Sequence, residues 1–212
     1  MIAPLVVATA RVLSGAQARW TGCVPSDRQR IYFANHTSHL DFVVLWAALP
    51  PAVRKLTRPV AARDYWEPNA LRRYLAARVF NAVLVDRHDA AGQPARDRAQ
   101  RVDAARRTVE LTADALGSRH SLIVFPEGTR GDGSDVGPFK SGLYYLSQLR
   151  PDVELVPAYL EHLNRILPKG EVLPVPLMAS VTFGPPLTIA AGEDRGMFLE
   201  RARRAVLDLR RT

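Results

Sequence analysis

The chain has 212 residues, of which 47% are hydrophobic and 24% are charged, and it carries a formal net charge of +8. These values are typical of one folded globular domain and argue against a disordered chain. The basic excess favours an anionic partner such as a phosphorylated substrate or an acidic membrane surface, whereas no signature of a nucleic-acid-binding module is present. The single cysteine, Cys23, excludes an internal disulfide and a cysteine metal cluster.

An apolar N-terminal helix is expected over residues 1–22. At helical spacing, one face of this segment carries Ile2, Leu5, Val6, Thr9, Leu13, Ala16 and Trp20. The apolar run is shorter than the roughly 20 residues that cross a bilayer, and no basic residue precedes it as in a secretory signal. We therefore expect a helix that either packs on the globular domain, residues 23–212, or lies in a membrane interface with Trp20 as its anchor.

Strand and helix patterns alternate along the rest of the chain. Strands are predicted at 31–34, 59–62, 82–85, 121–125, 153–156 and 178–183. Helices are predicted at 42–49, 71–80, 95–116 and 141–149, and from about residue 193 onward. The inward face of the helix at 95–116 is expected to carry Val102, Ala105, Val109, Thr112 and Leu116. The alternation predicts an α/β fold, a single domain with a mainly parallel sheet and helices on both faces.

Functional residues of such sheets gather just beyond the carboxyl ends of the strands. Three charged pairs occupy positions of this kind, namely His36/Asp41, Asp86/Arg87 and Glu127/Arg130.

His36 and Asp41 would point about 140° apart on one regular helix, so they can meet only where the segment straddles a turn. The predicted strand to Ala34, followed by a helix from about residue 39, supplies that turn. A carboxylate bonded to one imidazole nitrogen leaves the other nitrogen free as a general base. Alternative interpretations are a helix-capping Asp41, a zinc site that adds His39, and Ser38 as a nucleophile. The last two lack the His-Glu-x-x-His and Gly-x-Ser-x-Gly patterns.

Two segments resemble the glycerolipid acyltransferase family, which includes 1-acylglycerol-3-phosphate acyltransferases. Asn35-His36-Thr37-Ser38-His39-Leu40-Asp41 resembles its first block, and Phe125-Pro126-Glu127-Gly128-Thr129-Arg130 resembles its third, in the family's order. Residues 81–87 resemble the second block but lack its glycine, and residues 155–158 resemble the fourth. Residues 138–142 resemble the basic segment after the third block. The resemblance covers about residues 30–190.

The resemblance implies that His36 deprotonates an acceptor hydroxyl and that Asp41 orients His36. The alkoxide would then attack an acyl thioester directly, without an acyl-enzyme. The substrate-binding residues that it implies are Arg87, Glu127, Gly128, Thr129, Arg130 and Lys140.

Among those residues the resemblance implies different roles. Glu127 would hold acceptor hydroxyls or organise Arg130, and Gly128 would let the backbone approach the substrate closely. Arg87, Arg130 and Lys140 would bind a phosphate, because guanidinium and ammonium groups suit that anion.

The implied function is an O-acyltransferase of phospholipid biosynthesis. It would move a fatty acyl group from acyl-CoA or acyl carrier protein to a lysophospholipid such as 1-acylglycerol-3-phosphate, without a cofactor or metal. The missing glycine leaves the identity of the acceptor open. The basic balance and the N-terminal helix predict a peripheral location on the cytoplasmic face of an anionic membrane. Two alternatives are a thioester or lipid hydrolase that uses the same His/Asp pair, and a non-enzymatic lipid-binding protein.

Overall fold

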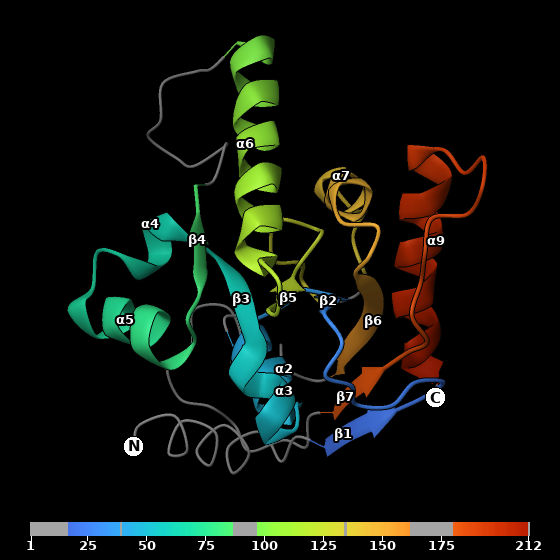
Figure 1. The fold of residues 1–212 in the computed structure, drawn as a ribbon, viewed down its shortest axis with the longest axis horizontal. Coiled ribbons are helices and arrows are strands. Elements are labelled where there is room, and N and C mark those ends of the chain that lie inside the picture. The colour runs from blue at the N-terminus through green and yellow to red at the C-terminus, as the bar shows by residue number, and fades with distance from the viewer. Residues whose placement is uncertain (1–16, 39, 87–96, 134, 162–179, 212) are drawn as a thin grey trace.

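The structure, a computed structural model, describes residues 17–38, 40–86, 97–133, 135–161 and 180–211. One seven-stranded sheet forms its centre, in the order β1-β7-β6-β2-β5-β3-β4 (Figure 1). The strands are β1 Gln17–Trp20, β2 Arg30–Ala34, β3 Thr57–Ala62, β4 Val83–Val85, β5 Ser121–Val124, β6 Glu154–Glu161 and β7 Ser180–Phe183.

Most of the sheet is parallel, as the sequence predicted. β2 pairs in parallel with both β5 and β6, and β3 pairs in parallel with both β5 and β4. β7 runs antiparallel to β6, and β1 then pairs in parallel with β7. Two strands at one edge therefore run against the other five.

The helices connect and cover these strands. They are α2 Asp41–Ala48, α3 Pro51–Leu56, α4 Arg63–Trp66, α5 Ala70–Tyr74, α6 Arg98–Leu116, α7 Gly142–Leu149 and α9 Arg195–Asp208. One π-helical turn, η1 Leu75–Val79, follows α5, and one 3-10 turn, η2 Leu209–Arg211, follows α9. Within the described ranges, no helix has both the length and the apolar character that a membrane span requires.

Side chains of the central strand β2 belong to two separate cores. Tyr32 and Ala34 lie in the cluster that α2 covers, whereas Ile31 and Phe33 lie in the cluster that α6, α7 and α9 cover. All four residues are fully buried. Because successive side chains of a strand point to opposite faces, the alternation confirms that helices cover both faces of the sheet.

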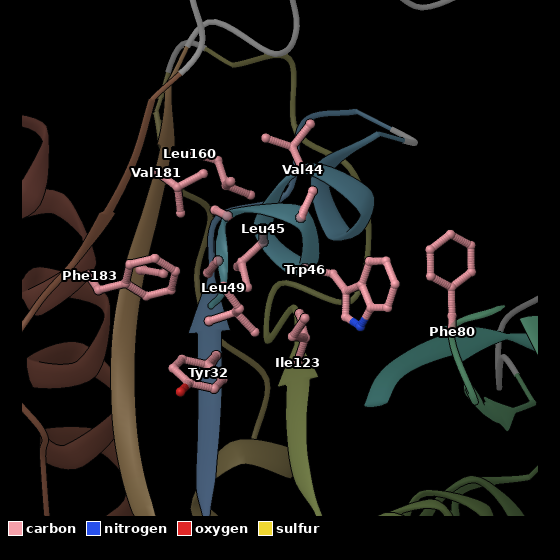
Figure 2. Close-up of a cluster of buried hydrophobic side chains, with 14 of the residues drawn as sticks. Tyr32, Val44, Leu45, Trp46, Leu49, Phe80, Ile123, Leu160, Val181 and Phe183 are labelled. Atoms are coloured by element: carbon pink, nitrogen blue, oxygen red, sulfur yellow. The ribbon is translucent and has the colours of Figure 1, made fainter. Parts of the chain in front are cut away.

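Helix α2 packs closely onto the first of these cores. Figure 2 shows Leu45 and Leu49 directed toward the strands and Trp46 directed toward Phe80. Leu45 and Leu49 are fully buried, and burial of a leucine side chain contributes roughly 1.5–3 kcal/mol to stability. This packing fixes α2 and therefore its first residue, Asp41.

The helix expected at the N terminus is wrong over residues 17–20, which form β1. Backbone pairing with β7 continues into a hydrogen bond from the Thr21 N–H to the Phe183 carbonyl, at 2.8 Å. Trp20 stacks on the ring of Phe183 with centroids 4.1 Å apart, so it packs on the sheet and is not a helix-face residue. The unpaired edge of β7 supplies the backbone partners that make a strand favourable here. Residues 1–16 lie outside the described part.

The inward face expected for the helix at 95–116 also needs correction. Val102 is 60% exposed, because the residues that α6 buries lie in its last turns, at Thr112, Ala113 and Leu116. The first half of α6 stands clear of the sheet (Figure 1). The helix predicted at 42–49 is confirmed as α2, and Pro51 then begins the separate short helix α3, because proline suits the first position of a helix.

Candidate active site

The first and third sequence blocks meet where β2 and β5 end side by side. Phe33 of β2 pairs with Val124 of β5, so the chain leaves both strands at the same edge of the sheet. Asn35 and His36 follow β2, and the segment up to Glu127 follows β5. The sheet thus brings together two segments about 90 residues apart, as expected for a site at the carboxyl ends of parallel strands.

The structure places His36 and Asp41 in direct contact. The imidazole Nδ1 of His36 lies 2.8 Å from Oδ2 of Asp41. The same oxygen accepts hydrogen bonds from the backbone N–H groups of Thr37, at 2.5 Å, and Ser38, at 2.9 Å. Asp41 is fully buried at the first position of α2, where the helix dipole favours a negative charge. The carboxylate is therefore held by three donors and by the helix that carries it.

This contact determines what the imidazole can do chemically. Because the carboxylate only accepts hydrogen bonds, Nδ1 carries the proton and Nε2 keeps its lone pair. The ring of His36 also stacks on Phe125, with centroids 4.4 Å apart and planes inclined by 24°. The His36 side chain keeps 22% of its surface exposed. It is therefore oriented on two sides and still accessible to a substrate.

Glu127 holds the backbone around His36. Its Oε1 accepts the N–H of His36 at 2.7 Å, and its Oε2 accepts the N–H of Gly137 at 2.8 Å. The carbonyl of His36 in turn accepts the N–H of Gly131 at 2.8 Å. Glu127 is 7% exposed, and among the described residues it forms no ion pair with Arg130. Its carboxylate therefore joins the segment after β2 to the segment after β5.

Asn35 is a site residue whose role the sequence did not reveal. Its side chain is buried and forms two hydrogen bonds with the backbone of Leu160 in β6, one from Nδ2 to the carbonyl and one from the N–H to Oδ1. These bonds fix the chain one residue before His36. The only sequence feature that indicated a role for Asn35 in the site was its place as the first residue of the Asn-His-x4-Asp block.

The exposed part of the third block forms a basic surface beside the His36–Asp41 pair. Thr129, Arg130 and Lys140 are all exposed. Gly128 has φ of +71°, and a Cβ atom there would lie 2.9 Å from the Lys140 Nζ, so the lysine side chain crosses the glycine. The Lys140 N–H also donates to the Pro126 carbonyl at 2.8 Å. The absence of a side chain at Gly128 thus allows the ammonium group of Lys140 to lie against the third block.

The second block is only partly described. Arg87 lies outside the described residues, whereas Asp86 follows β4 and pairs with Arg63 at 3.0 Å. Arg63 follows β3 and also pairs with Glu67 at 2.6 Å. The sequence did not single out Arg63, although an arginine directly after the strand predicted at 59–62 was the available signal. In this structure Asp86 thus has a partner other than its neighbour Arg87.

A cluster of aromatic side chains begins at the residue after Asp41. Phe42, the next residue, makes edge-to-face contacts with Trp66, at 5.4 Å between centroids, and with Phe80, at 5.0 Å. Trp46 contacts Phe80 in the same way.

Among the described residues no group of three or more histidine, cysteine, aspartate or glutamate side chains is arranged to hold a metal ion. His39, part of the zinc alternative, lies outside those residues.

Comparison with known proteins identifies several relatives. Residues 17–161 match the family model described as Acyltransferase. The chain is 30% identical over 178 residues to a 1-acyl-sn-glycerol-3-phosphate acyltransferase of Limnanthes alba, which covers 82% of this chain and 56% of the relative. It is 29% identical over 138 residues to a protein of the same name from Cocos nucifera, with 64% of this chain and 38% of the relative covered. The match thus spans little more than half the length of the Limnanthes alba protein and less than half the length of the Cocos nucifera protein.

A solved structure shares the fold. The crystal structure of the 1-acyl-sn-glycerophosphate (LPA) acyltransferase PlsC from Thermotoga maritima superposes with a TM-score of 0.68 at 18% sequence identity. The match covers 98% of this chain and 78% of that one. At this identity the similarity supports the α/β architecture alone.

Proposed function

This chain belongs to the acyltransferase family, and from that premise we propose that it is an O-acyltransferase of phospholipid synthesis. Its donor is an acyl thioester, either acyl-CoA or acyl carrier protein. Its acceptor is a hydroxyl of a lysophospholipid such as 1-acylglycerol-3-phosphate, the substrate class in the names of its relatives. The observation that carries the proposal is the buried Asp41 bonded to Nδ1 of a solvent-accessible His36.

The proposed reaction uses the free nitrogen of His36. Nε2 takes the proton of the acceptor hydroxyl as its oxygen attacks the thioester carbonyl carbon. The new C–O bond forms and the C–S bond breaks. The leaving thiolate then takes the proton from the imidazolium, which returns His36 to its neutral form. The negative charge of Asp41 stabilises the imidazolium between these two steps. No acyl-enzyme intermediate and no metal ion enter this scheme.

The charged residues around the pair suit a phosphate-bearing acceptor. Arg130 and Lys140 are exposed beside Gly128, and both side chains can donate to phosphate oxygens. Arg87 is proposed as a third cation on the basis of the sequence resemblance. The net charge of +8 further supports a peripheral location on the cytoplasmic face of an anionic membrane.

The decisive experiment is acyl transfer by the His36→Ala variant. Purified protein is supplied with an acyl-CoA or an acyl carrier thioester together with lysophosphatidic acid, and the lipid product is measured by mass spectrometry. We expect transfer by the wild type and its loss in His36→Ala, with folding intact. His120→Ala is the matched control, because His120 lies before β5 at the opposite end of that strand.

Three outcomes would contradict the proposal. Wild-type turnover in His36→Ala would exclude His36 as the base. Thiol release at the same rate without an acceptor lipid would identify a hydrolase that activates water with the same pair. Lysolipid binding without turnover of either donor would instead identify a binding protein.

A further inference from the structure

We propose that an exposed face of α5 and η1 binds the headgroup layer of an anionic phospholipid membrane. This face, the α5 surface, consists of Leu71, Arg72, Arg73, Tyr74 and Arg78. The choice of a lipid as partner rests on the proposed function, whereas the surface itself is defined by exposure and charge.

Apolar side chains on this face are directed into solvent. α5 buries none of its residues, and Leu71 and Tyr74 are 66% and 45% exposed. Residues 71, 74 and 78 follow one another at intervals of three and four, so they share one face of the helical segment. A leucine and a tyrosine exposed side by side with an arginine form an amphipathic surface suited to the membrane interface.

The charge of this segment has one sign. Residues 68–85 contain three arginines and no aspartate or glutamate. Arg72 lies over the ring of Tyr65, with Cζ 4.3 Å from the centroid, and Arg73 donates to the carbonyl of Glu67 at 3.3 Å. These contacts hold the guanidinium groups at the surface without neutralising them. The segment is therefore complementary to a negatively charged layer.

Ring contacts connect the α5 surface to the catalytic pair. Arg72 lies on Tyr65, the rings of Tyr65 and Trp66 are 5.5 Å apart, and Trp66 contacts Phe42 at 5.4 Å. Phe42 directly follows Asp41 in α2. A membrane bound at the α5 surface would thus be connected to the helix that carries Asp41 through three successive aromatic side chains.

The composition favours a lipid surface over a protein partner. Tyrosine and arginine prefer the headgroup region, where the ring or the aliphatic stem is buried and the polar end stays hydrated. A stable protein interface uses about 20–30 residues on each side. The α5 surface has five, on two short helical segments.

The test is sedimentation of the intact 212-residue chain with vesicles, in the absence of an acyl donor. One vesicle contains phosphatidylcholine alone, and the other contains phosphatidylcholine with phosphatidylglycerol. We expect tighter binding to the anionic vesicles. Because one arginine near an anionic surface changes the partition coefficient about fivefold, Arg73→Ser/Arg78→Ser should weaken that binding about 25-fold. Leu71→Ser/Tyr74→Ser should weaken binding to the same vesicles at least about tenfold.

A matched control lies on α9. Met197→Ser/Arg204→Ser removes a methionine that is 62% exposed and an exposed arginine. α5 and α9 lie at opposite ends of the molecule (Figure 1). We expect this variant to bind anionic vesicles as the wild type does.

Three results of the vesicle assay would overturn the proposal. These are unchanged vesicle binding by both α5 variants, equal binding of the wild type to neutral and anionic vesicles, and an equal loss in the α9 control. A change in the sedimentation coefficient of the α5 variants without vesicles would also overturn it, because the face would then be an interface between copies of this chain. Vesicle binding without acyl transfer would refute the proposed function and leave the α5 surface supported.

Discussion

The carboxylate of Glu127 accepts the backbone N–H of His36, with 2.7 Å between Oε1 and N. Its other oxygen accepts the N–H of Gly137, so one side chain bridges the segments that follow β2 and β5. The family resemblance implies that this glutamate holds acceptor hydroxyls. The hydrogen bonds add a second role for Glu127, in which it positions the imidazole through the backbone of His36.

Replacement of Glu127 by glutamine separates these two roles. The amide keeps one acceptor oxygen but presents an NH2 group to one of the two backbone N–H donors. We expect kcat to fall on the order of 100-fold, because a small displacement of the base is sufficient for that loss, while KM for the lysolipid changes little. Steady-state kinetics with varied acceptor would measure both constants. A raised KM with unchanged kcat would show that Glu127 acts mainly by binding the acceptor.

Gly137 offers a test of the same bridge from its other end. A Cβ atom at 137 would lie 2.8 Å from Oε2 of Glu127, whereas a Cβ atom at Gly131 would lie 3.6 Å from that oxygen. We therefore expect Gly137→Ala to displace the carboxylate and lower kcat, and Gly131→Ala to resemble the wild type. Kinetics of the two alanine variants, with melting temperatures as a check on folding, would make the comparison. Equal, wild-type kcat in both would mean that Glu127 can shift without moving His36.

Asp41→Asn removes the charge beneath the imidazole but nearly keeps the shape of the side chain. The uncharged amide no longer stabilises the imidazolium or selects the tautomer with the proton on Nδ1. We expect kcat to fall by a factor on the order of 10³. Transfer assays would be compared with those of Asp114→Asn, an exposed residue of α6. Full activity of Asp41→Asn in a folded protein would exclude the assigned role.

The strands that carry the site could be predicted because their sequences are locally distinctive. Ile31–Ala34 and Leu122–Phe125 are continuous apolar runs, which is typical of strands buried on both faces. The turn between Ala34 and Asp41 was also inferable, because only a break in the helix lets His36 reach the carboxylate.

Other features depend on partners far away in the sequence. β1 has three exposed residues out of four, and it forms because β7 offers a free edge. The hydrogen bonds of Glu127 to His36 and Gly137 depend on the path of an irregular loop, which has no periodicity to interpret. The pairing of Arg63 with Asp86 likewise follows from the adjacency of β3 and β4.

A pH-dependent contribution to stability is expected from Glu193. The guanidinium of Arg201 donates hydrogen bonds to both carboxylate oxygens, at 2.7 and 2.6 Å, and the Ala190 N–H donates to one of them. These bonds lower the pKa of Glu193 from 4.5 to about 2. The unfolded chain therefore binds this proton more readily than the folded one. The stabilisation is present above about pH 4.5 and is lost as the pH falls toward 2.

Glu193→Gln should lower the free energy of unfolding by about 1 kcal/mol at pH 7, a small value because the partly exposed Arg201 is screened by solvent. The difference from the wild type should shrink between pH 4.5 and 2. Urea denaturation at neutral and acidic pH would measure it, with Glu200→Gln as a control whose contact with Arg203 is longer, at 3.4 Å. A deficit that stays constant across this pH range would show that Glu193 stabilises the start of α9 by its shape and hydrogen bonds, independently of its charge.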